Sequence, residues 1–247
     1  MMRIEGSVAL VTGANRGLGK AFAEALQAAG AAKVYAAARD PAIITDARLV
    51  PVPLDVTSPA QIKAVARACA DVTLLINNAG IMLLSPVLAE GAEEALRQEL
   101  EVNVFGPLAL ARAFAPALAR NGGGAVVNML SVVSWFTNPF NATYCASKHA
   151  ALAVTDALRI QLHAQGTQVC GVYAGFIDTG MAAKVGEAKA SPQQIAACVL
   201  EGVQAGETHI LADGAARDIS AALHANPHAL QAAMQQDWDR GASPWSI

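Results

Sequence analysis

A tyrosine and a lysine four residues apart are the first residues whose types and spacing suggest chemistry. Tyr144 and Lys148 lie in the segment YCASK, among small side chains. Residues i and i+4 share one face of a helix, so both groups can point toward the same place. A nearby ammonium lowers the pKa of a tyrosine from its usual value of about 10. The pair predicts proton transfer with Tyr144 as general acid or base, although a surface tyrosine beside a solvated lysine has the same spacing.

Glycines near the start of the chain indicate a second kind of site, for a phosphate group. In VALVTGANRGLGKAFAEAL, an apolar run is followed by Gly13, Gly17 and Gly19 and then by a helical pattern. Glycines in such a turn let a pyrophosphate approach backbone N–H groups, and the helix N-terminus adds a favourable dipole. Because the spacing is G-x-x-x-G-x-G and not G-x-G-x-x-G, the pattern alone also allows a turn without a ligand.

The end of the next apolar run indicates which dinucleotide would fit. In VYAAARD, Arg39 and Asp40 follow the glycine turn by about 20 residues, where the ribose is read. An arginine there binds a 2′-phosphate, whereas a carboxylate accepts from a 2′-hydroxyl and repels the phosphate. Arg39, with Arg16 as a second cation, favours NADP over NAD. NAD stays possible because Asp40 is next, although Asp40 can also pair with Arg39 or begin the following loop.

The elements that must position these residues alternate along the chain. Short apolar runs alternate with alanine-rich helical stretches, as in a sheet of buried parallel strands. Helices are predicted at 19–29 and 143–165, and Ser191 with Gln194 predicts a capping box at the start of another. We expect one α/β domain over 1–247, a Rossmann-type doubly wound parallel sheet of about seven strands with helices on both faces. The predicted strands are 7–11, 33–37, 49–53, 74–76, 125–129, 168–173 and 208–211.

Composition narrows the classes of function. Apolar residues make up 54% of the chain, charged residues 15%, and the net charge is −3. A large core is therefore expected, and no nucleic-acid partner, because no basic patch exists. We see no secretory signal and no uninterrupted apolar run of about 18 residues, so no membrane span is expected. The four cysteines and five histidines are scattered, which predicts neither a metal site nor disulfides and favours a reduced, cytoplasmic setting.

Six motifs in this order and spacing resemble the short-chain dehydrogenase/reductase family. Beside the glycine turn and YCASK, they are LDV at 54–56, NNAG at 77–80, VNVFG at 102–106 and NMLSVVS at 128–134. Each motif is weak alone, and together they are specific and cover the chain from Thr12 to about Thr179. The resemblance implies a single Rossmann-type domain that uses a nicotinamide cofactor, usually as a homotetramer or homodimer. The family's frequent Pro-Gly after the sixth strand is Ala174-Gly175 here.

Matched position by position, the resemblance implies four catalytic residues. Tyr144 exchanges the proton, Lys148 lowers its pKa and binds the nicotinamide ribose, and Ser131 donates to the substrate carbonyl. Asn103 holds a water that connects Lys148 to solvent. Ser134 competes with Ser131 as the donor, but Ser131 has the family's spacing to Tyr144. The residues implied to contact the cofactor, with Asp55 and Val56 at the adenine ring, are Gly13, Asn15, Arg16, Gly17, Leu18, Gly19, Arg39, Asp55, Val56, Asn77, Ala79, Gly80, Tyr144, Lys148, Gly175, Ile177 and Thr179.

The implied activity is NADPH-dependent hydride transfer, as in a carbonyl reductase or alcohol dehydrogenase. The predicted pocket walls are largely apolar, which favours a neutral, hydrophobic ketone, aldehyde or secondary alcohol. The alternative is a cofactor-binding regulatory protein without turnover, against which Ser131, Tyr144 and Lys148 argue. The apolar segment 244–247 is expected to dock on a neighbouring subunit of a homo-oligomer. The predicted walls are 81–84, Trp135, Phe136, Asn141, Phe176 and 181–190.

Overall fold

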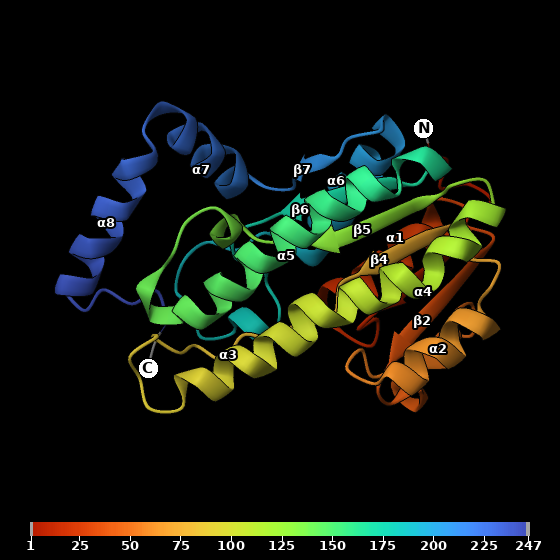
Figure 1. Cartoon of the computed structure of the whole chain (residues 1–247), viewed down its shortest axis with the longest axis horizontal. Helices are drawn as coiled ribbons and strands as arrows, with labels where there is room; N and C mark the ends of the chain where they lie inside the picture. The colour runs from red at the N-terminus through yellow and green to blue at the C-terminus, as the bar shows by residue number, and fades with distance from the viewer. Residues whose placement is uncertain (1, 246–247) are drawn as a thin grey trace.

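A computed structural model describes residues 2–245, and it has one parallel sheet with helices on both faces (Figure 1). The strand order is β3-β2-β1-β4-β5-β6-β7, and each neighbouring pair is parallel. The order reverses between β1 and β4, where ligands of open α/β sheets bind. The predicted fold class is confirmed. The strands are β1 (Val8–Thr12), β2 (Lys33–Ala38), β3 (Val50–Pro53), β4 (Leu74–Asn77), β5 (Ala125–Met129), β6 (Gln168–Tyr173) and β7 (His209–Leu211).

The helices form two outer layers and one projection (Figure 1). α1 (Gly17–Ala28) and α6 (Pro192–Ala205) cover one face of the sheet. α2 (Pro59–Ala68), α4 (Gly106–Arg120) and α5 (Ala142–Gln161) cover the other. α3 (Ala92–Leu100) continues into α4 through a π-helical turn, η2 (Glu101–Phe105), while α7 (Gly214–Ala225) and α8 (Pro227–Asp239) extend beyond the sheet. Short helical turns are η1 (Pro41–Ile43), η3 (Val132–Ser134), η4 (Pro139–Asn141), η5 (His163–Gln165) and η6 (Gly180–Ala182).

The core lies between the sheet and these two layers because the strands are buried on both faces. Alternate residues of a strand point to opposite faces. Ala9 and Ile76 therefore pack toward α1 and α6, whereas Leu10 and Leu75 pack toward α2, α4 and α5. All four side chains are fully buried, which explains why the strand sequences are continuous apolar runs rather than alternating ones.

The predicted elements agree with the structure, with small shifts at their ends. The helix predicted at 19–29 begins earlier, at Gly17. The helix predicted at 143–165 is α-helical from Ala142 to Gln161 and ends in the turn η5. The capping box is confirmed, since Ser191 Oγ accepts from Gln194 N at 3.2 Å and Gln194 Oε1 accepts from Ser191 N at 3.1 Å.

The continuous helical stretch Ala92–Arg120 is long and apolar enough, by length and composition alone, to cross a membrane. Its side chains Leu110, Phe114 and Leu118 are fully buried in the core beneath α4. Packing against the sheet therefore accounts for the apolar composition of this stretch.

Candidate active site

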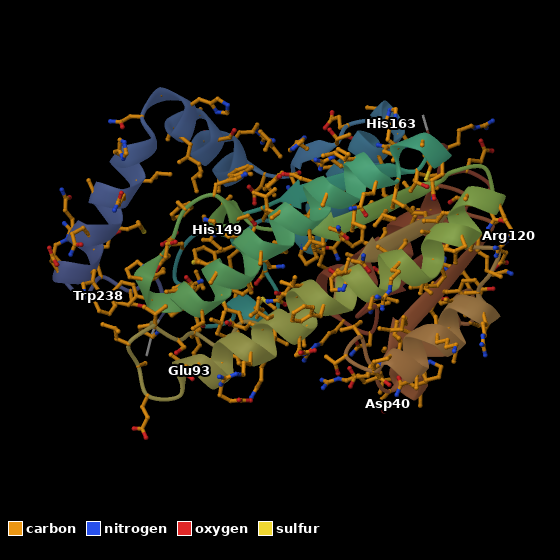
Figure 2. All side chains as sticks on the ribbon, viewed as in Figure 1. Asp40, Glu93, Arg120, His149, His163 and Trp238 are labelled. Carbon is orange, nitrogen blue, oxygen red and sulfur yellow. The ribbon has the colours of Figure 1, made fainter. Side chains whose placement is uncertain are left out.

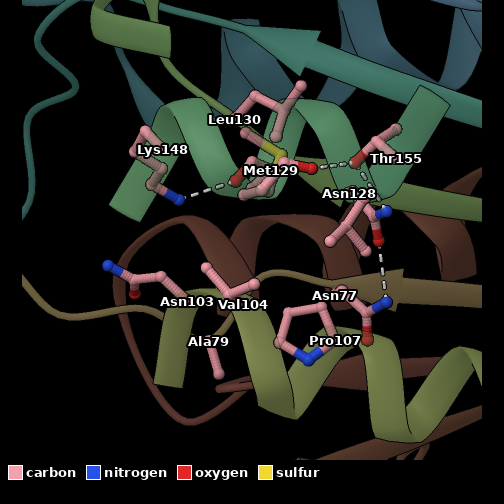
Figure 3. A pocket seen from close by; sticks show the side chains of 12 residues that line it. Asn77, Ala79, Asn103, Val104, Pro107, Asn128, Met129, Leu130, Lys148 and Thr155 are labelled. Carbon is pink, nitrogen blue, oxygen red and sulfur yellow. Dashed lines mark hydrogen bonds between the residues drawn. The ribbon is translucent and has the colours of Figure 1, made fainter. Parts of the chain in front are cut away.

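Tyr144 and Lys148 share one face of α5, as their spacing predicts. The Lys148 Nζ atom lies 5.5 Å from the centre of the Tyr144 ring. The same nitrogen donates to the carbonyl of Met129 at 2.8 Å, at the carboxyl end of β5 (Figure 3). Lys148 is 6% exposed. The helix therefore brings a phenol and an ammonium together at the sheet edge where ligands of this fold bind.

Burial is the largest cause of the pKa shifts of Lys148 and Tyr144. It lowers the pKa of Lys148 to about 8, against an opposing effect of Glu99. Burial also raises the pKa of Tyr144 above its ordinary value, and Cys145 and Glu99 add to this effect, while the Ser131 hydroxyl opposes it. Burial, and not the Lys148 ammonium, is thus the main cause of the pKa shift of Tyr144 in this structure, and the lowering of that pKa by Lys148 stays a prediction. The phenol stays protonated near neutral pH and can act as a proton donor.

Two serines follow β5, and their hydrogen bonds give them different roles. Ser134 is 1% exposed, and its hydroxyl accepts from the Ser131 backbone N–H at 3.2 Å. Ser131 is half-buried; its hydroxyl donates to the Ala174 carbonyl over a long 3.4 Å and accepts from Val133 N at 3.4 Å. Ser134 thus supports the turn, whereas Ser131, whose hydroxyl lowers the pKa of Tyr144, is the hydroxyl available beside the phenol.

Asn103 lies in the π-helical turn η2 and uses its whole amide to hold neighbouring segments. Its Oδ1 accepts from Ile81 N at 2.9 Å, and its Nδ2 donates to Ile81 O at 2.9 Å and to Ser147 Oγ at 3.0 Å. A cavity of about 10 Å³ lies between Asn103 and Lys148 (Figure 3), which is room for one water molecule. Because both amide protons are engaged, a water there would donate either to the second lone pair of Oδ1 or to the backbone carbonyl of Asn103.

The glycine turn is shaped to receive a phosphate group. Gly13 and Gly17 have positive φ angles of 66° and 52°, which side chains disfavour. A Cβ atom on Gly19 would overlap the Gly13 carbonyl oxygen. At this end of α1, Lys20 N donates to the Arg16 carbonyl at 3.2 Å, and the N–H groups that precede it in the first turn stay available to an anion. Asn15 is half-buried in the turn, and the Leu18 side chain faces the core.

Thr12, at the end of β1, connects the glycine turn to the NNAG segment. Its hydroxyl accepts from the backbone N–H groups of Asn78 and Ala79, each at 2.9 Å. The Asn78 amide in turn donates to the Thr12 carbonyl at 2.9 Å. Gly80 follows, where a Cβ would lie 3.2 Å from Asn103 Oδ1. Thr12 and Asn78 belong to the motifs, but sequence analysis assigned them no role, because their contacts join strands that are neighbours in the sheet and far apart along the chain.

The Asn77 side chain points into the protein, and the implied place of this residue beside the cofactor stays a prediction. It is 2% exposed, and its Nδ2 donates to Asn128 Oδ1 at 2.8 Å. Asn128 donates to Thr155 Oγ1 at 3.0 Å, so a polar chain runs from β4 through β5 to α5 (Figure 3). The Asn77 side chain therefore ties the central strands to α5. Its backbone is the part left to line a cofactor.

The end of β2 and the glycine turn each carry an exposed arginine. Asp40 caps the turn η1 by accepting from Ala42 N at 3.0 Å, so it begins the following loop, which was one of the predicted alternatives. Arg39 and Arg16 are exposed, and within residues 2–245 neither forms an ion pair. Hydrogen bonds from Thr57 lower the pKa of Asp55, and the charge of Arg39 adds to this. Arg39 and Asp55 are thus neighbours.

Val56, the other residue predicted at the adenine ring, is largely buried. It is 8% exposed and packs against the start of α4, where a Cβ on Gly106 would lie 3.1 Å from its side chain. Only a small part of Val56 is available to a ligand, whereas the carboxylate of Asp55 lies nearer the surface. The structure therefore places the two predicted residues side by side with different exposure.

The Ala174-Gly175 turn is held by a residue that the sequence did not indicate. Asp213 Oδ2 accepts from Gly175 N at 2.8 Å, and its Oδ1 caps α7 by accepting from Ala216 N at 2.8 Å. The turn leads to Ile177, which pairs with Ala190, and to Thr179, whose side chain approaches Gly17. One carboxylate thus fixes a turn in which the family frequently has proline.

The segment after the NNAG motif is anchored by a second unpredicted acid. Glu99 is fully buried, and its Oε1 accepts from Leu83 N at 2.8 Å. Leu84 has a φ of 53°, which is uncommon for a leucine. Thr143 N donates to the carbonyl of Ser85 at 3.2 Å. Burial raises the pKa of Glu99. Sequence reasoning missed this residue because Glu93, Glu94 and Glu101 surround it, and burial alone distinguishes it.

Six apolar residues pack beside the start of α5, and we refer to them as the wall cluster. Four come from the predicted walls, one comes from the segment 244–247, and Phe140, which was not predicted, directly precedes the predicted wall residue Asn141. Trp245 was predicted to dock on a neighbouring subunit. It is instead 5% exposed and packs within its own chain, because the other members of the cluster offer it an apolar surface there. Ser246 and Ile247 lie outside the described residues. The members of the wall cluster are Met82, Phe140, Phe176, Ala182, Val185 and Trp245.

Comparison with known proteins agrees with this geometry. Residues 7–190 match the family described as short chain dehydrogenase. The chain is 33% identical over 187 residues to galactitol 2-dehydrogenase of Agrobacterium fabrum, covering 72% of this chain and 73% of that one. It is 33% identical over 189 residues to the 3-oxoacyl-[acyl-carrier-protein] reductase FabG of Vibrio cholerae, covering 73% and 77%. A short chain dehydrogenase from Burkholderia cenocepacia, solved with NADP, is 42% identical with a TM-score of 0.91 over 94% of this chain and 99% of that one.

Proposed function

The chain belongs to the short-chain dehydrogenase/reductase family of oxidoreductases, which act on CH–OH and C=O groups, and on this premise we propose that it is an NADPH-dependent carbonyl reductase. The observation that supports this proposal is the pair on α5. Tyr144 lies on the same face as Lys148 and beside Ser131, and burial raises the pKa of its phenol. A protonated phenol suits reduction, in which the carbonyl oxygen must receive a proton.

In the proposed mechanism, this chain's residues orient and protonate the substrate oxygen. Ser131 donates a hydrogen bond to the carbonyl oxygen, and Tyr144 transfers its proton to the same oxygen as negative charge develops there. Lys148, positively charged near neutral pH, stabilises that charge and holds its own position through the Met129 carbonyl. A bound nicotinamide would supply the hydride. The water-sized cavity between Asn103 and Lys148 supports a path by which Tyr144 regains its proton.

The proposed preference for NADPH rests on two exposed cations, one after β2 and one in the glycine turn. Arg39 and Arg16 are exposed near Asp55 and the glycine turn, respectively, and Asp40 is engaged as a cap. Guanidinium groups bind phosphate oxygens by forked, charge-assisted contacts. The similar Burkholderia protein was solved with NADP, which supports the same preference. NAD remains the alternative cofactor.

A neutral, apolar carbonyl compound is the proposed substrate class. The wall cluster consists of aromatic and aliphatic side chains, and exposed apolar residues Leu83, Leu84 and Met181 lie on the same segments. Apolar walls favour a substrate that loses little hydration on binding. Some relatives are named for polyols, as in galactitol 2-dehydrogenase, so galactitol is the polar compound against which this proposal must be tested.

The test is NADPH consumption with apolar ketones and aldehydes, with oxidation of galactitol measured beside it. Tyr144→Phe is expected to lower kcat by about 10²–10⁴-fold, the usual contribution of general acid catalysis, while the Kd for NADPH stays unchanged. Tyr35→Phe is the matched control. Tyr35 lies on β2, away from Tyr144, and its phenol contacts Lys33 and Asp71. Binding of NADPH without turnover of any substrate would favour the regulatory alternative. Equal activity of Tyr144→Phe and the wild type would contradict the mechanism.

A further inference from the structure

Trp245 connects the segments that form the wall cluster. Its backbone forms an antiparallel bridge with Val185, and Gly186 N donates to the Pro244 carbonyl at 3.4 Å. Its ring meets that of Phe176 edge-on, at 5.8 Å and 90°, a favourable arrangement for two aromatic rings. Trp245 therefore holds the segment between β6 and α6 by both backbone and side-chain contacts.

The wall cluster is also joined to the catalytic helix. Phe140 precedes Asn141, whose Nδ2 lies 3.5 Å from the Met82 sulfur and whose Oδ1 accepts from the Cys145 thiol at 3.2 Å. Cys145 is fully buried and adjoins Tyr144; burial raises the pKa of its thiol to about 12, so it packs as a small neutral group. A displacement of Met82 or Phe140 would thus be passed through Asn141 to Cys145, the neighbour of Tyr144.

We propose that Trp245 is a positioning residue that sets the largest substrate the enzyme accepts, by fixing Phe176 and Met82 beside the start of α5. This inference rests on the proposed function. The Trp245 indole N–H is buried and has no acceptor within residues 2–245, so apolar packing holds the ring. A phenylalanine at this position would keep that packing and lose no hydrogen bond, whereas alanine would remove the wall.

The test compares kcat/KM for a bulky and a small ketone in the wild type, Trp245→Ala and Trp245→Phe. We expect Trp245→Ala to raise the bulky-to-small ratio by about tenfold or more, within the range that apolar pocket changes produce, through KM for the bulky ketone. Trp245→Phe is expected to stay within about threefold of the wild-type ratio. Trp245→Leu replaces Trp245→Ala if the latter does not fold. An unchanged ratio in the folded variant would overturn the proposal.

Two further measurements separate this proposal from other outcomes. Lys184 is exposed and lies on the segment that Trp245 holds, between Ala182 and Val185. Loss of that contact should let trypsin cleave after Lys184 faster in Trp245→Ala than in the wild type, a readout that needs no enzymatic activity.

Trp238 on α8 provides the matched control. It packs against Phe140 at 5.1 Å but is 45% exposed and outside the wall cluster (Figure 2). Trp238→Ala should leave the substrate ratio unchanged, and an equal shift in both variants would contradict the role of Trp245. Failure of the proposed function would differ, because the wild type would then reduce neither ketone.

Discussion

A buried lysine and a half-buried tyrosine share one face of α5, and the proposed mechanism uses this pair for proton transfer. Desolvation favours the neutral form of each group, so the pKa of Lys148 falls and the pKa of Tyr144 rises. Tyr144 therefore keeps its proton near neutral pH, whereas Lys148 loses its proton above about pH 8. Spacing in the sequence predicted which residues meet, but it did not predict this balance, because burial depends on the strands and helices around α5.

The unfolding free energy should reveal the cost of burying Lys148. Its pKa is about 8 in the folded chain against 10.5 unfolded, so between these values the unfolded chain binds more protons and stability rises with pH. From pH 7 to pH 10, the wild type should gain about 2–3 kcal/mol relative to Lys148→Met. Denaturant titrations of both proteins at each pH measure this. A constant difference across the range would show that Lys148 titrates normally.

Removing the charge of Glu99 should change the alkaline side of the pH–activity profile. Glu99 raises the pKa of Lys148, so Glu99→Gln lowers that pKa further while the amide oxygen still accepts from Leu83 N–H. In the proposed mechanism reduction uses protonated Lys148, so kcat/KM should begin to fall at lower pH in Glu99→Gln than in the wild type. Glu93→Gln, an exposed glutamate on the same helix, is the control. Identical profiles for all three proteins would exclude the coupling.

At the scale of elements, the site depends on connections between the carboxyl ends of neighbouring strands. The Thr12 hydroxyl at the end of β1 accepts from two N–H groups after β4, and Asp213 joins the turn after β6 to α7. The sequence predicted the strands and the capping box from local patterns alone. It did not predict these connections, because each partner lies far along the chain and becomes a neighbour only through the strand order.

Thr12→Val should lower the unfolding free energy more than the small change in side-chain size suggests. Valine has nearly the shape of threonine, but it leaves the part-buried N–H group of Ala79 without an acceptor and that of Asn78 with only the Ile76 carbonyl. One unsatisfied group costs about 1–3 kcal/mol, so a loss of that size is expected. Thr12→Ser keeps the hydroxyl and should stay within about 1 kcal/mol of the wild type. Equal denaturation midpoints for the two variants would mean that these hydrogen bonds contribute nothing.

At the scale of the whole molecule, the order of strands decides which motifs share a site. The reversal between β1 and β4 brings the glycine turn beside the NNAG segment, although 64 residues separate Gly13 from Asn77. Family resemblance predicted this arrangement, and local pattern could not have done so. Phe105 and Ile160 are 50% and 78% exposed on the outer helices, and assembly into a dimer or tetramer stays a prediction.

Binding of NADPH should stabilise the whole fold, because a ligand that binds only the folded chain shifts the unfolding equilibrium. At one hundred times Kd, the gain is about 2.7 kcal/mol, visible as a rise in Tm. Arg39→Ala should reduce NADPH affinity about 10- to 100-fold, corresponding to one lost charge-assisted contact of about 1.5–3 kcal/mol. NADH affinity should change little, since NADH has no 2′-phosphate.

Because Arg39 is exposed, replacing it should change cofactor affinity without disturbing the fold. Arg39 has no ion-pair partner within the described chain, so its removal should leave the unliganded Tm almost unchanged. Arg120→Ala is the matched control, because this exposed arginine at the end of α4 lies far from Asp40 and the end of β2 (Figure 2). Isothermal titration with both cofactors decides the outcome. Equal losses of NADPH and NADH affinity in Arg39→Ala would mean that Arg39 attracts the dinucleotide by its charge without reading the 2′-phosphate, and the NADPH preference would have to come from Arg16.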